Sequence, residues 1–358
     1  MLKKIFIIIN VVLALAIVCV HFATGVSPQD FWIFAFLGLI YPLFLLVNVV
    51  FTFVWLFTKT KLLALISFIA LVITYKSNMA TFQISIPAKT TDEISLMTWN
   101  VKNFDLYNWS GNEETRAKMF ELLKENRPDI LCLQEFYTED KGKFQNLKDL
   151  KKELDYKYVY FAKTYTLNKN RHWGLVIFSD KKIIDTGKLL FKEGTLLNSC
   201  MYADIALSKT QNARLYNVHL QSNQLNTEDM QLFESLDEAP EKTKSSIFSV
   251  VSKMKKGYIN RAKQTHQVLE SKANSPYPAI IVGDFNDVPI SYAYKQLSKG
   301  MQDAYVKKGN GFSKSFNSKV PYLRIDYALF HSMFKINKYE VIEAELSDHY
   351  PVVVKFKY

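Results

Sequence analysis

The chain is poor in cysteine and lacks the local motifs of several enzyme classes. Its 358 residues include three cysteines, Cys19, Cys132 and Cys200, with no CxxC or cysteine–histidine spacing typical of zinc sites. Cys19 lies in an apolar run, and the other two lie in or beside strand-like segments, so we interpret them as small buried residues. A GxSxG elbow and a reactive-cysteine arrangement are also missing, which argues against a covalent nucleophile.

Charge is scarce in the first fifth of the chain. Residues 5–20 and 31–57 are mostly apolar and uncharged, and residues 62–75 form a shorter apolar run. A membrane helix needs about 20 apolar residues, so the first two runs qualify and the third needs snorkelling lysines or local thinning. We therefore predict a membrane anchor of about three transmembrane helices at residues 1–76. A cleaved signal peptide remains the alternative for the first run.

The short loops of this anchor predict its orientation. The N-terminus carries Lys3 and Lys4, the loop 21–30 has no Lys or Arg, and the loop 58–61 is basic again. Basic loops stay in the cytoplasm. Three spans would therefore make a multi-pass protein of the cytoplasmic membrane, with the rest of the chain on the extracytoplasmic, periplasmic side. Two spans would invert this arrangement.

A polar linker at 77–92 is expected to connect the anchor to one domain at 93–358. Short strand-like segments outnumber helical ones in that domain, which favours an α+β sandwich. The net charge is +11, from 45 Lys and Arg against 34 Asp and Glu, which favours anionic partners: nucleic acid, phosphate esters or acidic lipid. No helix-turn-helix or aromatic RNA-binding motif is evident, so sequence-specific recognition is not expected. No protein partner is predicted.

The stretch 279–291 combines a predicted buried strand with candidate catalytic residues at its end. An apolar run at 279–282 predicts a buried strand that ends at Gly283, and Asp284 and Asn286 follow one residue apart. Ser291 can cap the next helix. A carboxylate and an amide on a rigid strand end can hold water against an electrophile, although an ordinary turn also favours Asp and Asn.

Polar side chains recur at or near other apolar strands, and each has an ordinary explanation when taken alone. A lone His219, for example, is more often structural than catalytic. Burying so many polar groups is costly unless they are paired, so we expect them to converge on one cleft. Asp326 is the expected exception, because it interrupts a predicted strand at 323–330. The set is Asn100, Glu135, His219, Asp284, Asn286, Asp326, Asp348 and His349.

Six segments carry a family resemblance. They are TWNVKNF (98–104), LQEF (133–136), YNVHLQSN (216–223), GDFND (283–287), RIDY (324–327) and SDHYPVV (347–353). In this order the domain resembles the endonuclease/exonuclease/phosphatase superfamily, the group of the pancreatic-type deoxyribonuclease, the abasic-site endonuclease and the neutral sphingomyelinases. The resemblance implies a four-layer α/β sandwich, with two stacked mixed β-sheets flanked by helices and the site at their shared edge.

The resemblance also implies roles. Glu135 matches the metal-binding carboxylate, with Asn100 beside it and Asp348 in a supporting or metal role, for Mg²⁺ or Mn²⁺. The matching catalytic residues are Asp284 for the attacking water, Asn286 for the transition state, His349 with Asp326 as its orienting partner, and His219 for phosphate.

Two features depart from that pattern or add to it. Lys102 stands where some branches carry an acidic residue, which puts a second metal in doubt. A long charged insertion at 223–273 places Arg261 and Gln264 on one helical face. These two side chains either bind substrate phosphate or lie on a solvated face.

The sequence therefore predicts a membrane-anchored, divalent-metal-dependent phosphodiesterase, foremost of nuclease type. A phospholipid or sphingolipid phosphodiesterase is the alternative, and an inactive tethered binding module is a third reading. The expected partners are a phosphodiester substrate and the lipid bilayer.

Overall fold

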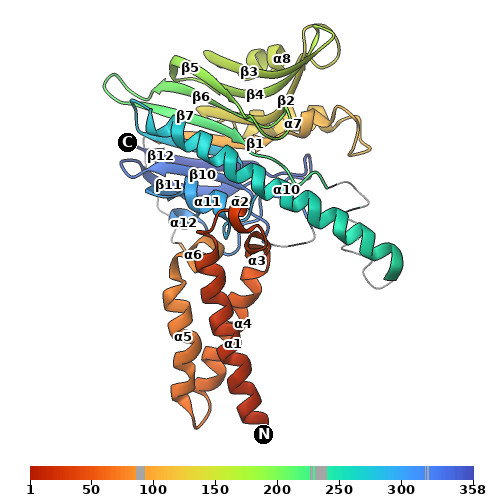
Figure 1. The fold of residues 1–358 in the computed structure, drawn as a ribbon. Coiled ribbons are helices and arrows are strands. Elements are labelled where there is room, and N and C mark those ends of the chain that lie inside the picture. Colours follow the sequence, from red (N-terminus) through yellow and green to blue (C-terminus); the bar gives the residue numbers. More distant parts are fainter. Residues whose placement is uncertain (86–92, 226–228, 230–239, 319, 321) are drawn as a thin grey trace.

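A column of helices carries a two-sheet domain at one end (Figure 1). The computed structural model describes residues 1–358 except 86–92, 226–228, 230–239, 319 and 321. The helices of the N-terminal part are α1 (Leu2–Ala23), α2 (Pro28–Phe31), α3 (Phe34–Leu37), η1 (Gly38–Ile40), α4 (Tyr41–Leu56), η2 (Lys61–Leu63), α5 (Ala64–Ile73) and α6 (Tyr75–Thr81).

Two N-terminal helical segments, Leu2–Ala23 and Phe34–Leu56, are long and apolar enough to span a membrane. The pair Lys61–Ile73 and Tyr75–Thr81, bent by 74°, adds a third candidate if it is one broken span. Exposed apolar side chains such as Leu15, Leu46 and Phe68 line the outside of these helices, a surface suited to lipid. Asn10 is fully buried among them, where it donates to Ser67 Oγ and accepts from Trp55 Nε1. Such hydrogen bonds hold α1, α4 and α5 together without a hydrophobic driving force.

The domain contains two mixed sheets, as predicted, and each has six strands. The first has the order β11-β12-β1-β2-β4-β3 and the second the order β5-β6-β7-β8-β10-β9. The pairs β1–β2 and β7–β8 are parallel. The first sheet comprises β1 (Ile94–Asn100), β2 (Ile130–Glu139), β3 (Tyr158–Leu167), β4 (Arg171–Ser179), β11 (Lys335–Val341) and β12 (Val352–Lys357). The second comprises β5 (Lys182–Leu190), β6 (Ser199–Ala206), β7 (Asn212–His219), β8 (Ala279–Asp284), β9 (Met301–Asp303) and β10 (Asp326–His331).

Helices cover the outer face of each sheet, which completes the four layers. The apolar spacing of α7 places Met119, Phe120 and Leu123 against the first sheet, while Val268 of α10 packs on the second. Ser291 caps α11 as expected, because its Oγ accepts from the Tyr294 amide. The remaining elements are η3 (Lys102–Asp105), α7 (Thr115–Glu125), α8 (Asn146–Glu153), α10 (Pro240–Ala273), α11 (Tyr292–Leu297) and α12 (Ala304–Lys308).

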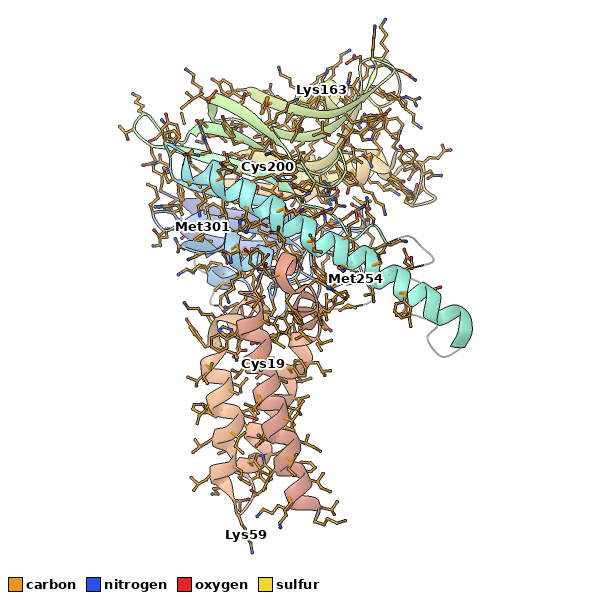
Figure 2. The ribbon with its side chains drawn as sticks, in the orientation of Figure 1. Cys19, Lys59, Lys163, Cys200, Met254 and Met301 are labelled. Carbon is orange, nitrogen blue, oxygen red and sulfur yellow. The ribbon has the colours of Figure 1, made fainter. Side chains whose placement is uncertain are left out.

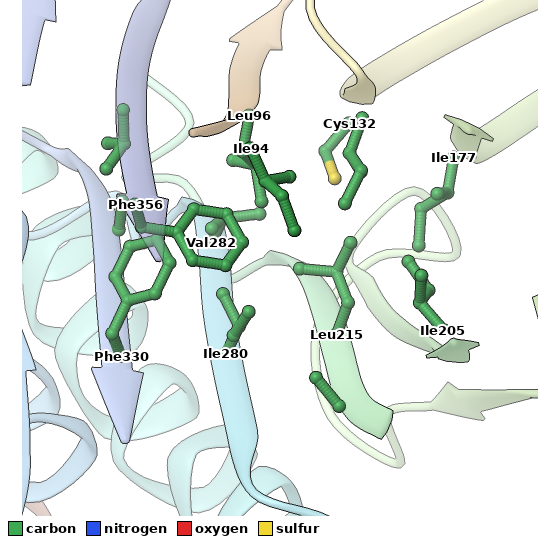
Figure 3. Close-up of a cluster of buried hydrophobic side chains, with 14 of the residues drawn as sticks. Ile94, Leu96, Cys132, Ile177, Ile205, Leu215, Ile280, Val282, Phe330 and Phe356 are labelled. Carbon is green, nitrogen blue, oxygen red and sulfur yellow. The ribbon is translucent and has the colours of Figure 1, made fainter. Parts of the chain in front are cut away.

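Between the sheets lies the main apolar core (Figure 3), where Leu96, Cys132, Leu215 and Val282 meet. Cys132 there and Cys200 in the outer layer are fully buried free thiols, and burial raises the pKa of both. Both are small buried residues, as the sequence predicted. Their protonated state makes them poor nucleophiles.

The predicted linker at 77–92 is wrong in its first part. Helix α6 continues to Thr81, and Gln83 pairs with Gly311 of the domain. Arg324 donates to the Ala80 carbonyl at 3.0 Å, and the Tyr305 hydroxyl donates to the Thr81 carbonyl at 3.1 Å. The anchor therefore docks directly on the domain.

Candidate active site

Three neighbouring strands of the second sheet place a row of titratable side chains at one edge. His219 ends β7, Asp284 ends β8 and Asp326 begins β10, and the strand register pairs His219 with Asp284 and Asp284 with Asp326. Because β10 runs antiparallel to β8, its first residue lies beside the last residue of β8. The expectation that Asp326 interrupts a strand is thus wrong: it begins one.

The glycine before Asp284 has a steric role. Gly283 has φ +126°, and a Cβ there would lie 2.1 Å from the Val218 carbonyl oxygen of β7. A side chain at this position would push the two parallel strands apart. The Gly–Asp sequence thus sets the spacing between His219 and Asp284.

The first sheet supplies Asn100 at the end of β1 and Glu135 in β2. The Asn100 amide Nδ2 donates to Glu135 Oε1 at 3.0 Å and to Asp284 Oδ2 at 3.1 Å, so it links the two sheets. Asn100 Oδ1 accepts from the Lys102 amide instead. The Asn100 amide thus orients two carboxylates, and its place beside a metal stays a prediction.

A bulge in β2 directs Glu135 into the site. The pairing of β2 with β4 shifts between Leu133 and Phe136, and Glu135 adopts φ +47°. A left-handed conformation costs a residue with a Cβ roughly 1–2 kcal/mol, so the surrounding structure must hold it. Bulges commonly re-aim a side chain next to an active site.

Asp284 is the centre of the hydrogen-bond network. Its Oδ1 accepts from the Asn286 backbone amide at 2.8 Å, and its Oδ2 accepts from the Asn286 side chain at 3.1 Å. Burial raises the pKa of Asp284 to about 6 and Asp326 adds to the rise, against the opposing effect of His349 and His219. This carboxylate can therefore act as a base near neutral pH.

His349 is held between two carboxylates. Its Nδ1 donates to Asp326 Oδ2 at 2.9 Å, and its Nε2 lies 3.6 Å from Asp284 Oδ2. Trp99 Nε1 donates to the His349 carbonyl at 2.8 Å and fixes its backbone. Burial alone would lower the pKa of His349, but Asp326 and Asp284 outweigh it and raise the pKa to about 10. His349 is thus an imidazolium at neutral pH, able to donate a proton.

His219 faces the remaining space between the sheets. Its Nδ1 donates to the Leu197 carbonyl at 3.3 Å, so Nε2 points at Glu135 Oε1, 3.6 Å away, and at Asp284 Oδ2, 3.7 Å away. Among the described residues, this buried Nε2 has no hydrogen-bond partner. This ring nitrogen can therefore contact a group that enters between the two carboxylates.

The donor set suits a hard divalent cation. Asp284, Asp326 and His349 each offer a ligand atom, and these atoms lie within 4.8 Å of one another. The Asp326–His349 hydrogen bond already uses part of that set, whereas Glu135, Asp284 and His219 Nε2 converge without such a bond. Carboxylate oxygens are the ligands that Mg²⁺ prefers.

Asp348 lies beside the cluster, paired with a lysine, which is compatible with the supporting role among its two predicted roles. Its Oδ2 forms an ion pair with Lys102 Nζ at 2.9 Å, and both side chains are one-third exposed. Burial opposes ionisation of Asp348, but His349 and Lys102 outweigh it and lower its pKa. Asp348 thus lies outside the ligand cluster, and its predicted metal role would require the loss of its pair with Lys102.

Arg261 and Gln264 are buried, so the solvated-face alternative is wrong, while phosphate binding by these two residues stays a prediction. Arg261 is 1% exposed, and its guanidinium binds Asp287 at 3.1 Å and the Gln221 carbonyl at 2.8 Å. Gln264 accepts from the Gln221 amide and donates to the Glu193 carbonyl. The shared helical face is real, but it faces the domain and anchors the loops beside the site.

Sequence reasoning missed a polar bridge beneath the site. Gln134 Nε2 donates to Asn217 Oδ1 at 2.7 Å across the two sheets. Asn217 Nδ2 in turn donates to the carbonyls of Leu133 and Val176, at 3.0 and 3.1 Å. The signal was present, because a Gln and an Asn stand inside otherwise apolar strands, where each must find a partner.

Comparison with known proteins agrees with this geometry. The sequence profile described as "Endonuclease/Exonuclease/phosphatase family" matches residues 97–349. The chain belongs to this family. Its members are hydrolases that act on phosphoester bonds, so this chain is a family phosphoesterase. Residues 3–81 match a separate domain of unknown function, and no curated protein matches the chain.

Solved structures show the same fold at low identity. The chain is similar to an endonuclease/exonuclease/phosphatase from Beutenbergia cavernae (TM-score 0.54, 16% identity, covering 74% of this chain and 71% of that one). It is also similar to a mannosyl-6-phosphatase from Bacteroides thetaiotaomicron (0.51, 19%, 74% and 100%) and to a Bacteroides vulgatus family protein (0.53, 15%, 75% and 99%). At these identities the likeness concerns the fold alone.

Proposed function

We propose that the chain is a membrane-anchored, divalent-cation-dependent phosphodiesterase of nuclease type. The observation that carries this proposal is the meeting of polar strand ends from both sheets around Asp284. Asp284, His349 and Glu135 supply the carboxylates and the imidazole that phosphodiester hydrolysis can use as base, acid and cation ligand.

The roles follow from the hydrogen bonds. Asp284, held by Asn100 and Asn286, positions the attacking water and accepts its proton. His349, kept protonated by Asp326, donates a proton to the leaving oxygen. His219 lies where its Nε2 can contact a non-bridging phosphate oxygen. Hydrolysis then needs no covalent intermediate, which agrees with the missing nucleophile motifs.

Glu135 is the residue we assign to Mg²⁺ or Mn²⁺, with His219 Nε2 3.6 Å from its carboxylate. Bound there, the cation would neutralise the phosphate and stabilise the charge that develops during hydrolysis. The Asn100 amide keeps the carboxylates of Glu135 and Asp284 directed toward the same point before any cation arrives.

For location, we propose three spans with the domain outside the cytoplasm. The N-terminus, near Lys3 and Lys4, and the α4–α5 loop lie at the end of the helix column far from the domain (Figure 1). Lys59 marks that end (Figure 2). The positive-inside rule then places the domain on the extracytoplasmic side.

A lipid phosphodiesterase is the second candidate, favoured by the direct docking of the anchor on the domain. Both candidates can be tested with the purified full chain in nanodiscs, with Mg²⁺ or with chelator, on DNA, RNA, lipid headgroup esters and sugar phosphates. We expect Mg²⁺-dependent cleavage of nucleic acid. Cleavage of lipid esters alone, or full activity in excess chelator, would contradict the proposal.

A further inference from the structure

Two exposed aromatic rings stand beside the site. Tyr107 and Trp109 lie between η3 and α7, with 60% and 49% of their surfaces exposed. Their ring centroids are 4.9 Å apart and the rings are tilted by 60°. Aromatic side chains bury large apolar surfaces when they pack, so leaving two adjacent ones exposed to water is costly. Such a pair is typical of a binding surface.

A chain of contacts joins this pair to the catalytic cluster. Lys102 Nζ lies 5.1 Å from the centroid of the Trp109 ring and 2.9 Å from Asp348 Oδ2. Asp348 directly precedes His349, the proposed acid. Trp109, Lys102 and Asp348 are therefore neighbours in space, and the buried His349 follows Asp348 in the chain.

The backbone holds this arrangement in an unusual conformation. Lys102, Asn103, Phe104 and Asp105 all have φ between 42° and 57°. Phe104 is fully buried and packs against Phe120 and Phe136, which anchors the left-handed turn. Strain of this kind persists only where surrounding packing enforces it and is often found at ligand-binding segments. This left-handed segment directs Lys102 toward Asp348 and brings Tyr107 and Trp109 to the rim of the site.

The chemistry of these groups selects a ligand. An acyl chain would need a continuous apolar groove, and a choline headgroup would bring a second positive charge to the ring that Lys102 already contacts. A flat ring carried by an anionic backbone uses both features, because the base stacks on an aromatic face while the ammonium attracts a phosphate.

We propose that Tyr107, Trp109 and Lys102 form a subsite that stacks one base of a single-stranded nucleic acid next to the phosphate being cleaved. This inference rests on the proposed phosphodiesterase function and assigns its substrate class. Stacking on an aromatic side chain tolerates any base, which agrees with the lack of a sequence-reading motif.

The test compares two tetranucleotides of equal charge, tetrathymidylate and its fully abasic analogue. Binding to the full chain in nanodiscs is measured in excess chelator and again with Ca²⁺. We expect wild type to bind tetrathymidylate about 10-fold more tightly, as one stacked base would give. Trp109→Ala should abolish this preference and Trp109→Phe should keep it. Tyr358→Ala, which removes another exposed aromatic ring, is the matched control and should change nothing.

Equal binding of the two tetranucleotides by wild type would overturn the subsite, as would no measurable binding of either. An unchanged preference in Trp109→Ala would also overturn it. Because binding is read without turnover, a base preference without Mg²⁺-dependent cleavage would contradict the proposed phosphodiesterase activity and leave the subsite standing.

Discussion

The substitution Asp326→Asn tests how the site keeps its acid protonated. The carboxylate of Asp326 accepts from His349 Nδ1 at 2.9 Å, and both groups are buried. Asparagine keeps the shape and can still accept a hydrogen bond, but it removes the negative charge. Without that charge, Asp284 is the main remaining group that stabilises the buried imidazolium against the cost of desolvation. The pKa of His349 must therefore fall.

The expected fall in the pKa of His349 can be worked out from the rise of that pKa above its usual value. The pKa of His349 is raised to about 10, from 6.5. If loss of Asp326 removes half of that rise or more, the pKa falls by about two units, or about 3 kcal/mol. Activity that needs the imidazolium is lost as pH rises through the pKa. The alkaline limb of the pH–rate profile should thus move from near 10 toward 8, and kcat at neutral pH should fall about 10²-fold from misorientation of the ring.

The assay is a pH profile of kcat for wild type, Asp326→Asn, His349→Ala and the double variant. If Asp326 acts through His349, the double variant should be no slower than His349→Ala alone. Thermal unfolding of each variant shows that the fold is kept. An alkaline limb that stays in place in Asp326→Asn, or rate losses that simply multiply in the double variant, would refute the reasoning.

Four further outcomes are expected. Asp284→Ala should lower kcat by about 10²-fold or more with the fold intact, and a near wild-type rate would remove Asp284 from the site. In the wild type, the acid limb of the pH–rate profile should lie near pH 6, because the active carboxylate of Asp284 is lost as pH falls through its raised pKa. Asn217→Ala should lower the urea-unfolding free energy by about 3 kcal/mol, because one N–H of Gln134 and the Leu133 and Val176 carbonyls lose their Asn217 partner, while Gln134 keeps its bond to Thr98; an unchanged unfolding midpoint contradicts this. Arg261→Met should cost roughly 3–5 kcal/mol by leaving the Asp287 carboxylate buried without its partner, measured by the same unfolding. Protease added to intact spheroplasts should digest the domain, and protection until the membrane is broken would exclude the three-span topology.

The local sequence pattern was enough to predict a residue's position where that position depends only on its own strand. The run before Gly283 predicted β8 and the placement of Asp284 at its end. The same logic failed for Asp326, because the residues before it are apolar enough to resemble strand. Whether β10 begins before or at Asp326 depends on its pairing with β8, which sequence spacing does not show.

Contacts between residues far apart in the sequence could not be predicted for the same reason. Periodicity placed Arg261 and Gln264 on one face of a helix, but only the packing of α10 on the domain shows that this face is buried. The left-handed conformation of Lys102 could not be foreseen either, since no glycine marks it. The six motifs located most of the candidate site, while the orientation of each side chain depended on long-range contacts.

The docking of α6 on the domain has a mechanical consequence. Because the Ala80 and Thr81 carbonyls accept hydrogen bonds from Arg324 and Tyr305, the domain cannot rotate freely about its junction with α6. If the N-terminal helices span a bilayer as we propose, the catalytic edge keeps one orientation toward that bilayer. Substrate then reaches this edge from a restricted set of directions.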